Sequence, residues 1–467
     1  MDLDYRHPLY EHYYDRWVKY AASYKGGEDY KTPGLSMLRK YLFEDDAPGE
    51  QYANRLAYTA MDNMTKLTVD TYRSFLFRSK PVRTFGNLKG NLAINRFLED
   101  VDFDGQDLDD FMKHANDMSM VYGQVWILVT KGFVNGIGTV EQENELNIRP
   151  YAKLFTPENV CDWEYQTQPN GAERLVYVKT KEWLGPNTVK YIVWREDEII
   201  TYVVDTDEQG NETVMMTELQ VNAIGRVPFI CLRANPSGHK GIGLSDVADV
   251  VGVQTAVFNM LSEAEQGIRI SNHPTLVKTM DVAATAGAGS VINVDNTLDP
   301  QLKPYLIEPA GTNIQSIVEM INLHVETFLR STHLGAIMAA RGLSAKSGIA
   351  LATEFEMLNT RLGDKAAKLE QAEHNIWELF WAWSGLQPDL DFDVEYHKSF
   401  DLRDNHADLK LYADALTLGV QSETFNRQLY KQIAKVVIDD GDALDAIYEE
   451  IDDGLQIIQE AEENTEE

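Results

Sequence analysis

The chain has 467 residues, of which 44% are hydrophobic and 25% charged, values that predict a folded protein of more than one domain. Its 42 basic and 74 acidic residues leave a net charge of −32, which argues against the basic surface of a sequence-specific nucleic-acid reader. No apolar run approaches the roughly 20 residues of a membrane span, and the acidic start Met1–Tyr5 does not resemble a secretion signal. We therefore expect folding in a cytoplasm without membrane contact.

The first half of the chain predicts helices followed by strands. An aromatic cluster from Tyr5 to Tyr20 is typical of a helix that packs onto a neighbouring surface. Apolar residues at spacings of three and four predict one long helix over 50–79 and a second over 106–121. From about 123 to 233, β-branched and aromatic runs separated by turn residues predict strands. This part is expected to be an α+β domain with a mostly antiparallel sheet.

Helical patterns return after Gly243. Ser245 is placed to cap a helix that begins at Asp246 and reaches about Ile270. A capping box that starts at Thr312 opens a second helix, which is expected to end near Gly335. The pattern therefore predicts two amphipathic helices with a short stretch between them.

The stretch between these helices predicts a small insert over 274–310, with short strands at 275–277 and 291–294. After a loop over 336–347, the longest helix runs almost to Gly385 and would span about 50 Å. Two short helical stripes follow Phe400. The last 29 residues contain thirteen acids and no base, which predicts a disordered tip.

Four short phrases in this order resemble those of the phage portal family, and the resemblance covers nearly the whole chain. The first closes the early helix, the second opens the first of the two amphipathic helices, the third opens the longest helix, and the fourth lies among the C-terminal helices. They are Arg78-Ser79-Lys80-Pro81, Gly243-Leu244-Ser245-Asp246, Ser347-Gly348-Ile349-Ala350-Leu351 and Gly419-Val420-Gln421-Ser422. None is specific alone, and the signal comes from their order and spacing.

The resemblance implies the portal fold, an α+β subunit with long helices that assembles into a ring, usually of twelve copies. It divides the chain into regions that the family calls wing, stem, clip, tunnel loop and crown. By analogy these are 1–243 (wing), 244–271 (first stem helix), 272–311 (clip), 312–334 (second stem helix), 335–348 (tunnel loop), 349–399 (long wing helix and linker) and 400–467 (helical crown and acidic tail).

The resemblance also implies a function. Such a ring sits at one vertex of the virion capsid, beside the major capsid protein, and double-stranded DNA passes through it during packaging and ejection. It docks the large subunit of the terminase motor and later a neck or adaptor protein. DNA would pass without sequence readout, and no cofactor is implied.

Candidate channel residues follow from charge. Phosphate contacts dominate nucleic-acid affinity, so an acidic wall would weaken the grip on passing DNA. The candidates are Glu263, Glu265, Glu319 and Glu326 in the stem helices. His333, Arg341 and Lys346 in or beside the tunnel loop could touch phosphates. In the clip, Lys278, Asp281, Asp295, Asp299 and Lys303 are candidate partner contacts. For each set, ordinary solvated or subunit-pairing charge remains the alternative.

Enzyme motifs are missing from the sequence. Ser344–Gly348 lacks the glycine pattern of a phosphate-binding loop, and neither HExxH nor GxSxG occurs. Cys161 and Cys231 lie in no zinc-binding spacing, so we expect reduced thiols. We therefore expect no catalytic residue and no metal. Another ring or connector protein of the virion head or neck, and a host-side scaffold protein, remain open alternatives.

Overall fold

The chain forms two compact units, Met1–Phe400 and Asp401–Glu467. Every strand pairing in the described residues is antiparallel, and helices accompany the sheets, so the predicted α+β class is confirmed. The computed structural model describes residues 3–452, apart from positions 33, 36, 46–49, 133–139, 208, 210–211, 273–274, 278–298, 300–304, 308–311, 336–347, 399, 401–404, 419, 421, 439–443, 445 and 449.

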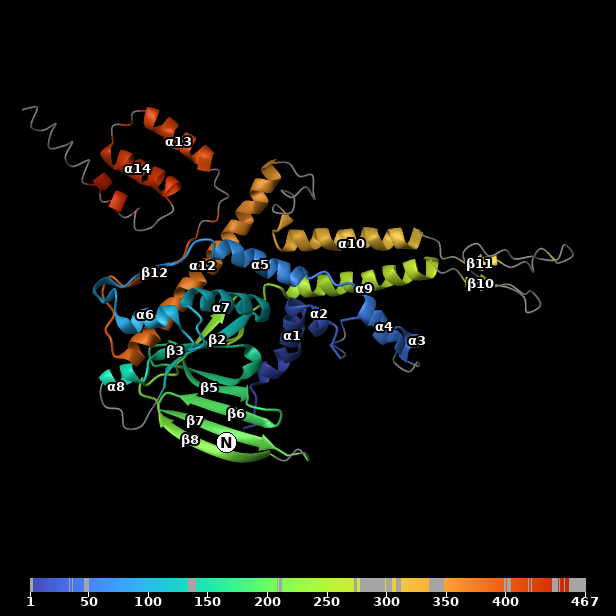
Figure 1. Ribbon diagram of the computed structural model, residues 1–467, viewed down its shortest axis with the longest axis horizontal. Helices are drawn as coiled ribbons and strands as arrows, with labels where there is room; N and C mark the ends of the chain where they lie inside the picture. Colours follow the sequence, from blue (N-terminus) through green and yellow to red (C-terminus); the bar gives the residue numbers. More distant parts are fainter. Residues whose placement is uncertain are drawn as a thin grey trace, which may run out of the picture. The chain divides into compact units, whose positions relative to one another are not determined.

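Blocks of helix and strand alternate along the first unit (Figure 1). Its helices are α1 (Pro8–Lys25), α2 (Gly27–Tyr30), α3 (Leu42–Asp45), α4 (Glu50–Tyr58), α5 (Met64–Leu76), η1 (Gly86–Leu88), α6 (Leu92–Glu99), α7 (Leu108–Tyr122), α8 (Val140–Glu145), η2 (Pro157–Asn159), α9 (Ala248–Asn272), α10 (Thr312–Ser331) and α12 (Gly348–Ser384). Its strands are β1 (Val82–Thr84), β2 (Gln124–Lys131), β3 (Pro150–Phe155), β4 (Val160–Thr167), β5 (Glu173–Trp183), β6 (Thr188–Arg195), β7 (Glu198–Thr206), β8 (Glu212–Val221), β9 (Phe229–Arg233), β10 (Thr275–Val277), β11 (Tyr305–Ile307) and β12 (Asp393–Glu395).

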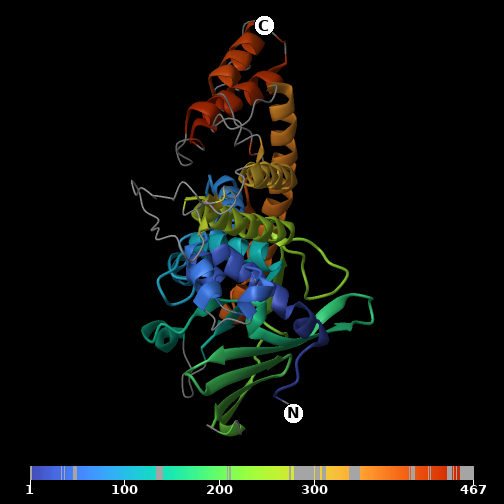
Figure 2. The ribbon, with the colours of Figure 1, turned by 90° about the vertical axis from the view of Figure 1, so that its right-hand side faces the viewer.

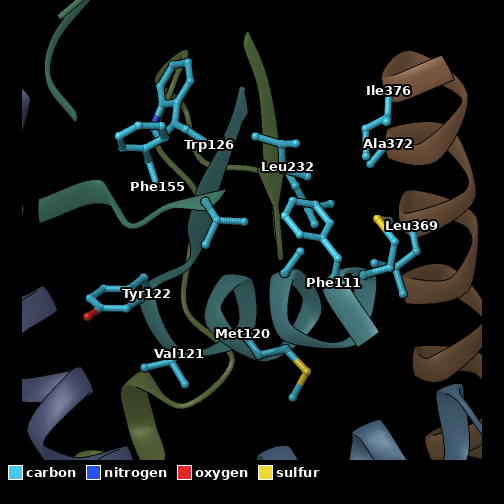
Figure 3. Close-up of a cluster of buried hydrophobic side chains, with 14 of the residues drawn as sticks. Phe111, Met120, Val121, Tyr122, Trp126, Phe155, Leu232, Leu369, Ala372 and Ile376 are labelled. Atoms are coloured by element: carbon cyan, nitrogen blue, oxygen red, sulfur yellow. The ribbon is translucent and has the colours of Figure 1, made fainter. Parts of the chain in front are cut away.

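The main core of the first unit surrounds a three-stranded sheet in the order β3-β2-β9. The central strand β2 is buried along nearly its whole length, because β3 and β9 flank it and α7 and α12 pack against it. Phe111 of α7, Leu232 of β9 and Leu369 of α12 belong to this apolar cluster (Figure 3). At about 25 cal/mol per Å² of buried apolar surface, such a cluster is the main source of stability of the unit.

A second sheet has the order β4-β5-β6-β7-β8 and forms an antiparallel meander. Its inner strands contribute Val178 and Trp194 to the main core, so the sheet is continuous with it. The strand β8, in contrast, is exposed along almost its whole length. The sheet lies at the opposite end of the unit from α10 in both views (Figures 1 and 2).

The prediction of one helix over 50–79 is wrong, because two helices, α4 and α5, replace it. Asn63 caps α5: its Oδ1 accepts a hydrogen bond from the amide of Lys66 at 2.8 Å, while its Nδ2 donates to the carbonyl of Tyr24 at 3.0 Å. A side chain that binds the backbone in this way favours a helix start over a helix interior. The predicted helix over 106–121 is confirmed as α7.

The second half of the first unit contains the expected long helices. The prediction that one helix begins at Asp246 is wrong by two residues, since α9 begins at Ala248, and α10 ends at Ser331 rather than near Gly335. The long helix is confirmed as α12. Of the two predicted strands in the insert, 275–277 is present as β10, which pairs with β11, whereas 291–294 lies outside the described residues.

In the described part of the second unit, α13 (Asn405–Thr417) and α14 (Glu423–Val437) lie at the two predicted apolar stripes. Ser422 caps α14, since its hydroxyl accepts a hydrogen bond from the amide of Phe425 at 3.4 Å. Most of the acidic stretch over 439–467 lies outside the described residues.

Candidate functional site

Helices α9 and α10 lie side by side, and the antiparallel β10–β11 pair belongs to the segment that joins them (Figure 1). Leu276 lies opposite Leu306 in that pair. The two helices come close at Gly267, where an added Cβ would lie 3.5 Å from Cγ1 of Ile314. The chain therefore leaves the unit along α9 and returns along α10. We call α9 and α10 together the paired helices.

The N-terminal helices cover one flank of α9. Arg55 of α4 and Glu44 of α3 form an ion pair at 2.8 Å with side chains only 3% and 2% exposed, and Arg55 also donates to the hydroxyl of Ser262 in α9 at 3.1 Å. The hydrogen bond from Arg55 lowers the pKa of Glu44 below its ordinary value. The hydroxyls of Tyr30 and Thr255 lie 3.2 Å apart further along the helix. This flank of α9 is thus occupied by its own chain.

The segment just before α9 is fastened to the end of α7. Gly243 and Gly123 cross so closely that a Cβ on either would overlap the carbonyl oxygen of the other, so a larger residue does not fit. The hydroxyl of Ser245 donates to the carbonyl of Val121 at 2.7 Å and accepts from the amide of Val247 at 3.1 Å. The Gly-Leu-Ser-Asp phrase therefore serves as an anchor, and Ser245 lies outside α9.

Asp246 gives this anchor a buried charge. Its carboxylate binds the ammonium of Lys365 and lies 3.1 Å from Nη2 of Arg361, both on α12, and it accepts a hydrogen bond from Asn235 at 3.0 Å. Burial by itself would raise the pKa of Asp246, but the two cations outweigh it and hold this pKa below its ordinary value. Burial lowers the pKa of Lys365, Asp246 opposes that shift, and Arg361 adds to it. An ion pair with a buried carboxylate therefore joins the segment just before α9 to α12.

The end of α10 is held by α5. The hydroxyl of Tyr72 donates to the carbonyl of Thr332 at 2.7 Å, and the guanidinium of Arg361 lies 5.5 Å from the centre of the Tyr72 ring. The next residue, His333, adopts a φ of 56°, a left-handed conformation that favours glycine. Burial and the positive charge of Arg361 lower the pKa of His333, while Glu354 opposes this shift. The imidazole is therefore mainly neutral at pH 7.

The predicted stem acids lie in two different environments. Glu263 of α9 and both Glu319 and Glu326 of α10 are exposed. Glu265 is half-buried, and its Oε1 accepts a hydrogen bond from the amide of Ala60 at 3.2 Å. Glu265 therefore faces the flank of α9 that the N-terminal helices cover, while the other three reach solvent in the single chain.

Helix α10 also exposes large apolar side chains. Val318, Met320 and Leu323 are 46%, 45% and 54% exposed, although Phe328 on the same helix is buried. Single exposed apolar residues are ordinary, but Met320 and Leu323 lie three residues apart on one face of α10 and together form a patch that needs an explanation, while Val318 lies on a different face. We call Met320 and Leu323 the α10 patch.

The other predicted site residues fall mostly outside the described residues, namely Lys278, Asp281, Asp295, Lys303, Arg341 and Lys346. Asp299 is described and exposed. Among the described residues, no three His, Cys, Asp or Glu side chains are grouped as a metal site would require. No described helix combines the length and hydropathy that a membrane span needs.

Sequence reasoning missed the ion pairs that hold the paired helices. Lys365 falls on the apolar stripe of α12 that also contains Leu362 and Leu369, and it is buried. A charged residue on an otherwise apolar helix face is a usable signal, because a buried charge needs a partner. The sequence does not identify the partner of Lys365, because Asp246 lies more than a hundred residues away in the chain.

Comparisons with known proteins found no matching family model and no matching curated protein. Among solved structures, a chain from the neck of an empty GTA particle computed with C6 symmetry is similar, with 9% sequence identity, a TM-score of 0.42 and coverage of 82% of this chain and 94% of that one. A chain from the neck of a native GTA particle computed with C12 symmetry gives 11% identity, a TM-score of 0.42 and coverage of 82% and 93%.

Proposed function

We propose that this chain is the subunit of a phage portal, a ring of about twelve copies that surrounds a DNA channel. The observation that carries the proposal is the pair of adjacent helices α9 and α10, which brackets a small antiparallel insert. One flank of α9 is covered by its own chain, whereas α10 keeps the α10 patch exposed. An amphipathic pair left half uncovered is what side-by-side packing of copies around a pore requires.

The charges near the α10 patch support a channel that does not grip DNA. Glu319 and Glu326 are exposed on α10, one before and one after the patch in the sequence. Lysine and arginine on a channel wall would hold phosphates, whereas carboxylates repel them and let the duplex slide. In this proposal the ring is a passive conduit without catalysis, and a separate terminase motor drives the DNA.

The proposal also includes the finer assignments. The β10–β11 insert would be the clip that meets the terminase large subunit and later a neck or adaptor protein, and the ring would sit in the capsid beside the major capsid protein. His333, Arg341 and Lys346 would contact passing phosphates near the tunnel loop. Because its pKa is lowered, His333 would act there as a neutral hydrogen-bond donor at pH 7.

The ring can be tested with one charge placed in the α10 patch. Leu323 is 54% exposed in the single chain, so Leu323→Glu should leave the subunit folded but bury an unpaired charge between copies. Mass photometry of the wild-type chain should show a species near twelve times 52.9 kDa, and the variant should remain monomeric. Leu390→Glu is the matched control, because Leu390 is fully exposed elsewhere, and it should assemble normally. Equal assembly by both variants would argue against packing through α10.

The tunnel-loop assignment needs its own experiment. Arg341→Ala combined with Lys346→Ala should reduce the DNA packaged or retained per virion, because two phosphate contacts per subunit are lost. Lys80→Ala is the control, since the Lys80 side chain is 87% exposed on another part of the unit. Unchanged packaging and retention in the double variant would remove the loop from the DNA path.

A further inference from the structure

The outermost strand of the five-stranded sheet has an unused edge. Within the described residues β8 pairs only with β7, although it is ten residues long. The amide of Asn222 donates a hydrogen bond to the carbonyl of Asp197 at 2.9 Å. In an antiparallel pair, alternate residues direct their backbone groups toward the partner strand and away from it, so this bond identifies which residues of β8 face β7. The backbone N–H and C=O groups of Thr217, Leu219 and Val221 therefore point away from β7. An edge of this kind is a template for one more strand.

One face of the same strand is apolar and uncovered. Val214, Leu219 and Val221 are 50%, 67% and 81% exposed. The strand register places Val214 beside Val204, Val204 beside Val189, and Val189 beside Trp183, which is 62% exposed, so these four side chains form one row across the sheet. Leu3 from the N-terminal segment packs on the inner part of this face, against Val189 and Val204. The apolar face then continues to β8 without cover from any described residue.

The other edge of the sheet, strand β4, is bound by the N-terminal segment of the chain. The amide of His7 donates to the carbonyl of Cys161 in β4 at 2.9 Å, and the rings of His7 and Trp163 stack with centroids 4.2 Å apart. The chain thus covers the start of its own β4 edge and leaves β8 open. A sheet that continued from β8 of one copy to β4 of the next would therefore have to displace this segment from the start of β4.

Symmetry and position exclude other pairings between copies. Two β8 strands could pair only across a two-fold axis, which the proposed cyclic ring lacks. Strands β5 to β8 lie successively farther from the paired helices (Figures 1 and 2). If those helices surround the channel, β8 lies at large radius, where neighbouring copies diverge. This step rests on the proposed function.

We propose that β8 receives an extended strand of a different protein that surrounds the ring, and that this strand adds antiparallel or parallel to the open edge as a sixth strand. The added strand would place apolar side chains beside Val214 and Leu219. It would also carry lysine or arginine, because the charged residues of β8 are Glu212 and Glu218, with no base. Backbone hydrogen bonds would supply affinity, and the alternating side chains would supply specificity.

A synthetic peptide of alternating valine and threonine with lysines at both ends, matched to the ten residues of β8, serves as the probe. Fluorescence anisotropy with the full chain should show binding, and hydrogen exchange should show new protection at Thr217, Leu219 and Val221. The same peptide with glutamates at its ends should bind about tenfold more weakly, a loss of about 1.4 kcal/mol. A version with alternate N-methylated amides should not bind, because it cannot complete the ladder.

Thr217→Pro is the decisive variant. Its lost N–H points outward, so the pairing with β7 should survive, and the affinity for the lysine peptide should fall at least about tenfold. Glu218→Pro is the contrast, since that N–H points to β7 and its loss should unfold the edge. If Thr217→Pro does not fold, the N-methylated peptide still decides the question on the wild-type chain.

Besides a failure to bind the peptide, three results would overturn strand addition at β8. The first is equal binding of the N-methylated peptide, and the second is undiminished binding by a folded Thr217→Pro variant. The third is exchange at β8 that slows with protein concentration alone, because it would show that a second copy occupies the edge. If the chain forms rings but binds no peptide, strand addition at β8 is refuted and the proposed function stands. If the chain binds the peptide but never forms rings, the proposed function is refuted and strand addition stands.

Discussion

At the scale of single residues, Asp246 is the position on which the start of the paired helices depends most. Asp246→Asn would leave Lys365 buried beside Arg361 with no carboxylate between them. Breaking a buried ion pair from one side costs about 3–5 kcal/mol, so urea unfolding should show a loss of that size. Asp249→Asn, at an exposed position in the first turn of α9, should cost less than about 1 kcal/mol. Equal losses in the two variants would contradict the buried role of Asp246.

The same carboxylate predicts a pH dependence. The pKa of Asp246 is lower in the folded chain than its ordinary value of 3.8, so its contribution is complete above that value and is lost as the pH falls through the folded value. The difference in unfolding free energy between the wild-type chain and Asp246→Asn should therefore be constant above about pH 5 and shrink below about pH 4. A difference that widens on acidification would show that the sign is wrong.

His333 offers a second residue-scale test. Its φ of 56° suits glycine better than a residue with a Cβ, so His333→Gly should change the unfolding free energy by up to about 1 kcal/mol in the stabilising direction. Arg330→Gly, in the last turn of α10, should instead destabilise by about 1 kcal/mol. Thermal unfolding of the two variants compares them directly. Destabilisation by His333→Gly would mean that the contacts of the imidazole stabilise the fold by more free energy than the left-handed backbone conformation costs.

At the scale of elements, the spacing of apolar residues correctly predicted the long uninterrupted helices and strands, but it did not predict where a helix is broken. Helices α7 and α12 and the strands over 123–233 follow from patterns that their own residues carry. The break between α4 and α5 contains no proline or glycine, so the apolar spacing runs through it. What ends the pattern is Asn63, whose side chain binds Tyr24, a residue far from it in sequence. Such contacts are fixed by tertiary packing.

The break itself is testable at its cap. Asn63→Ala removes the hydrogen bond to Lys66 at the start of α5 and the one to Tyr24 of α1, so we expect a loss of about 1–2 kcal/mol in urea unfolding. Asn95→Ala is the control, because Asn95 is exposed within α6 and alanine has the higher helix propensity. A stabilised Asn63→Ala chain would indicate that α4 and α5 prefer to join.

The candidate site was harder to predict than the elements that carry it. The sequence does not distinguish Glu263, Glu265, Glu319 and Glu326, yet Glu265 binds the segment that follows α4 in its own chain and the other three are exposed. Which side of a helix is covered depends on how the helix is oriented about its own axis relative to its neighbours. Periodicity alone does not fix that orientation when several other helices could pack against the same helix. The α10 patch was not predicted, although Met320 and Leu323 lie off the apolar stripe that Ile317, Ile321 and Phe328 mark on α10.

At the scale of the whole molecule, the net charge of −32 acts against assembly. Copies that pack side by side bring like charges together, and salt screens this repulsion over a Debye length of about 10 Å at 0.1 M. Raising NaCl from about 0.02 to 0.3 M should therefore increase the ring fraction seen by mass photometry. The Glu326→Gln chain, with one acid fewer on α10, should need less salt. Dissociation of rings by salt would show that ion pairs between copies hold them instead.

The most direct measurement of the central claim is an electron cryo-microscopy reconstruction of the purified full-length chain. The account predicts a closed ring of about twelve copies in which α9 and α10 of every copy lie nearest the central hole and β8 lies at the rim. A monomer under all conditions, or a ring whose hole is lined by the five-stranded sheet while the paired helices are buried away from it, would contradict the account.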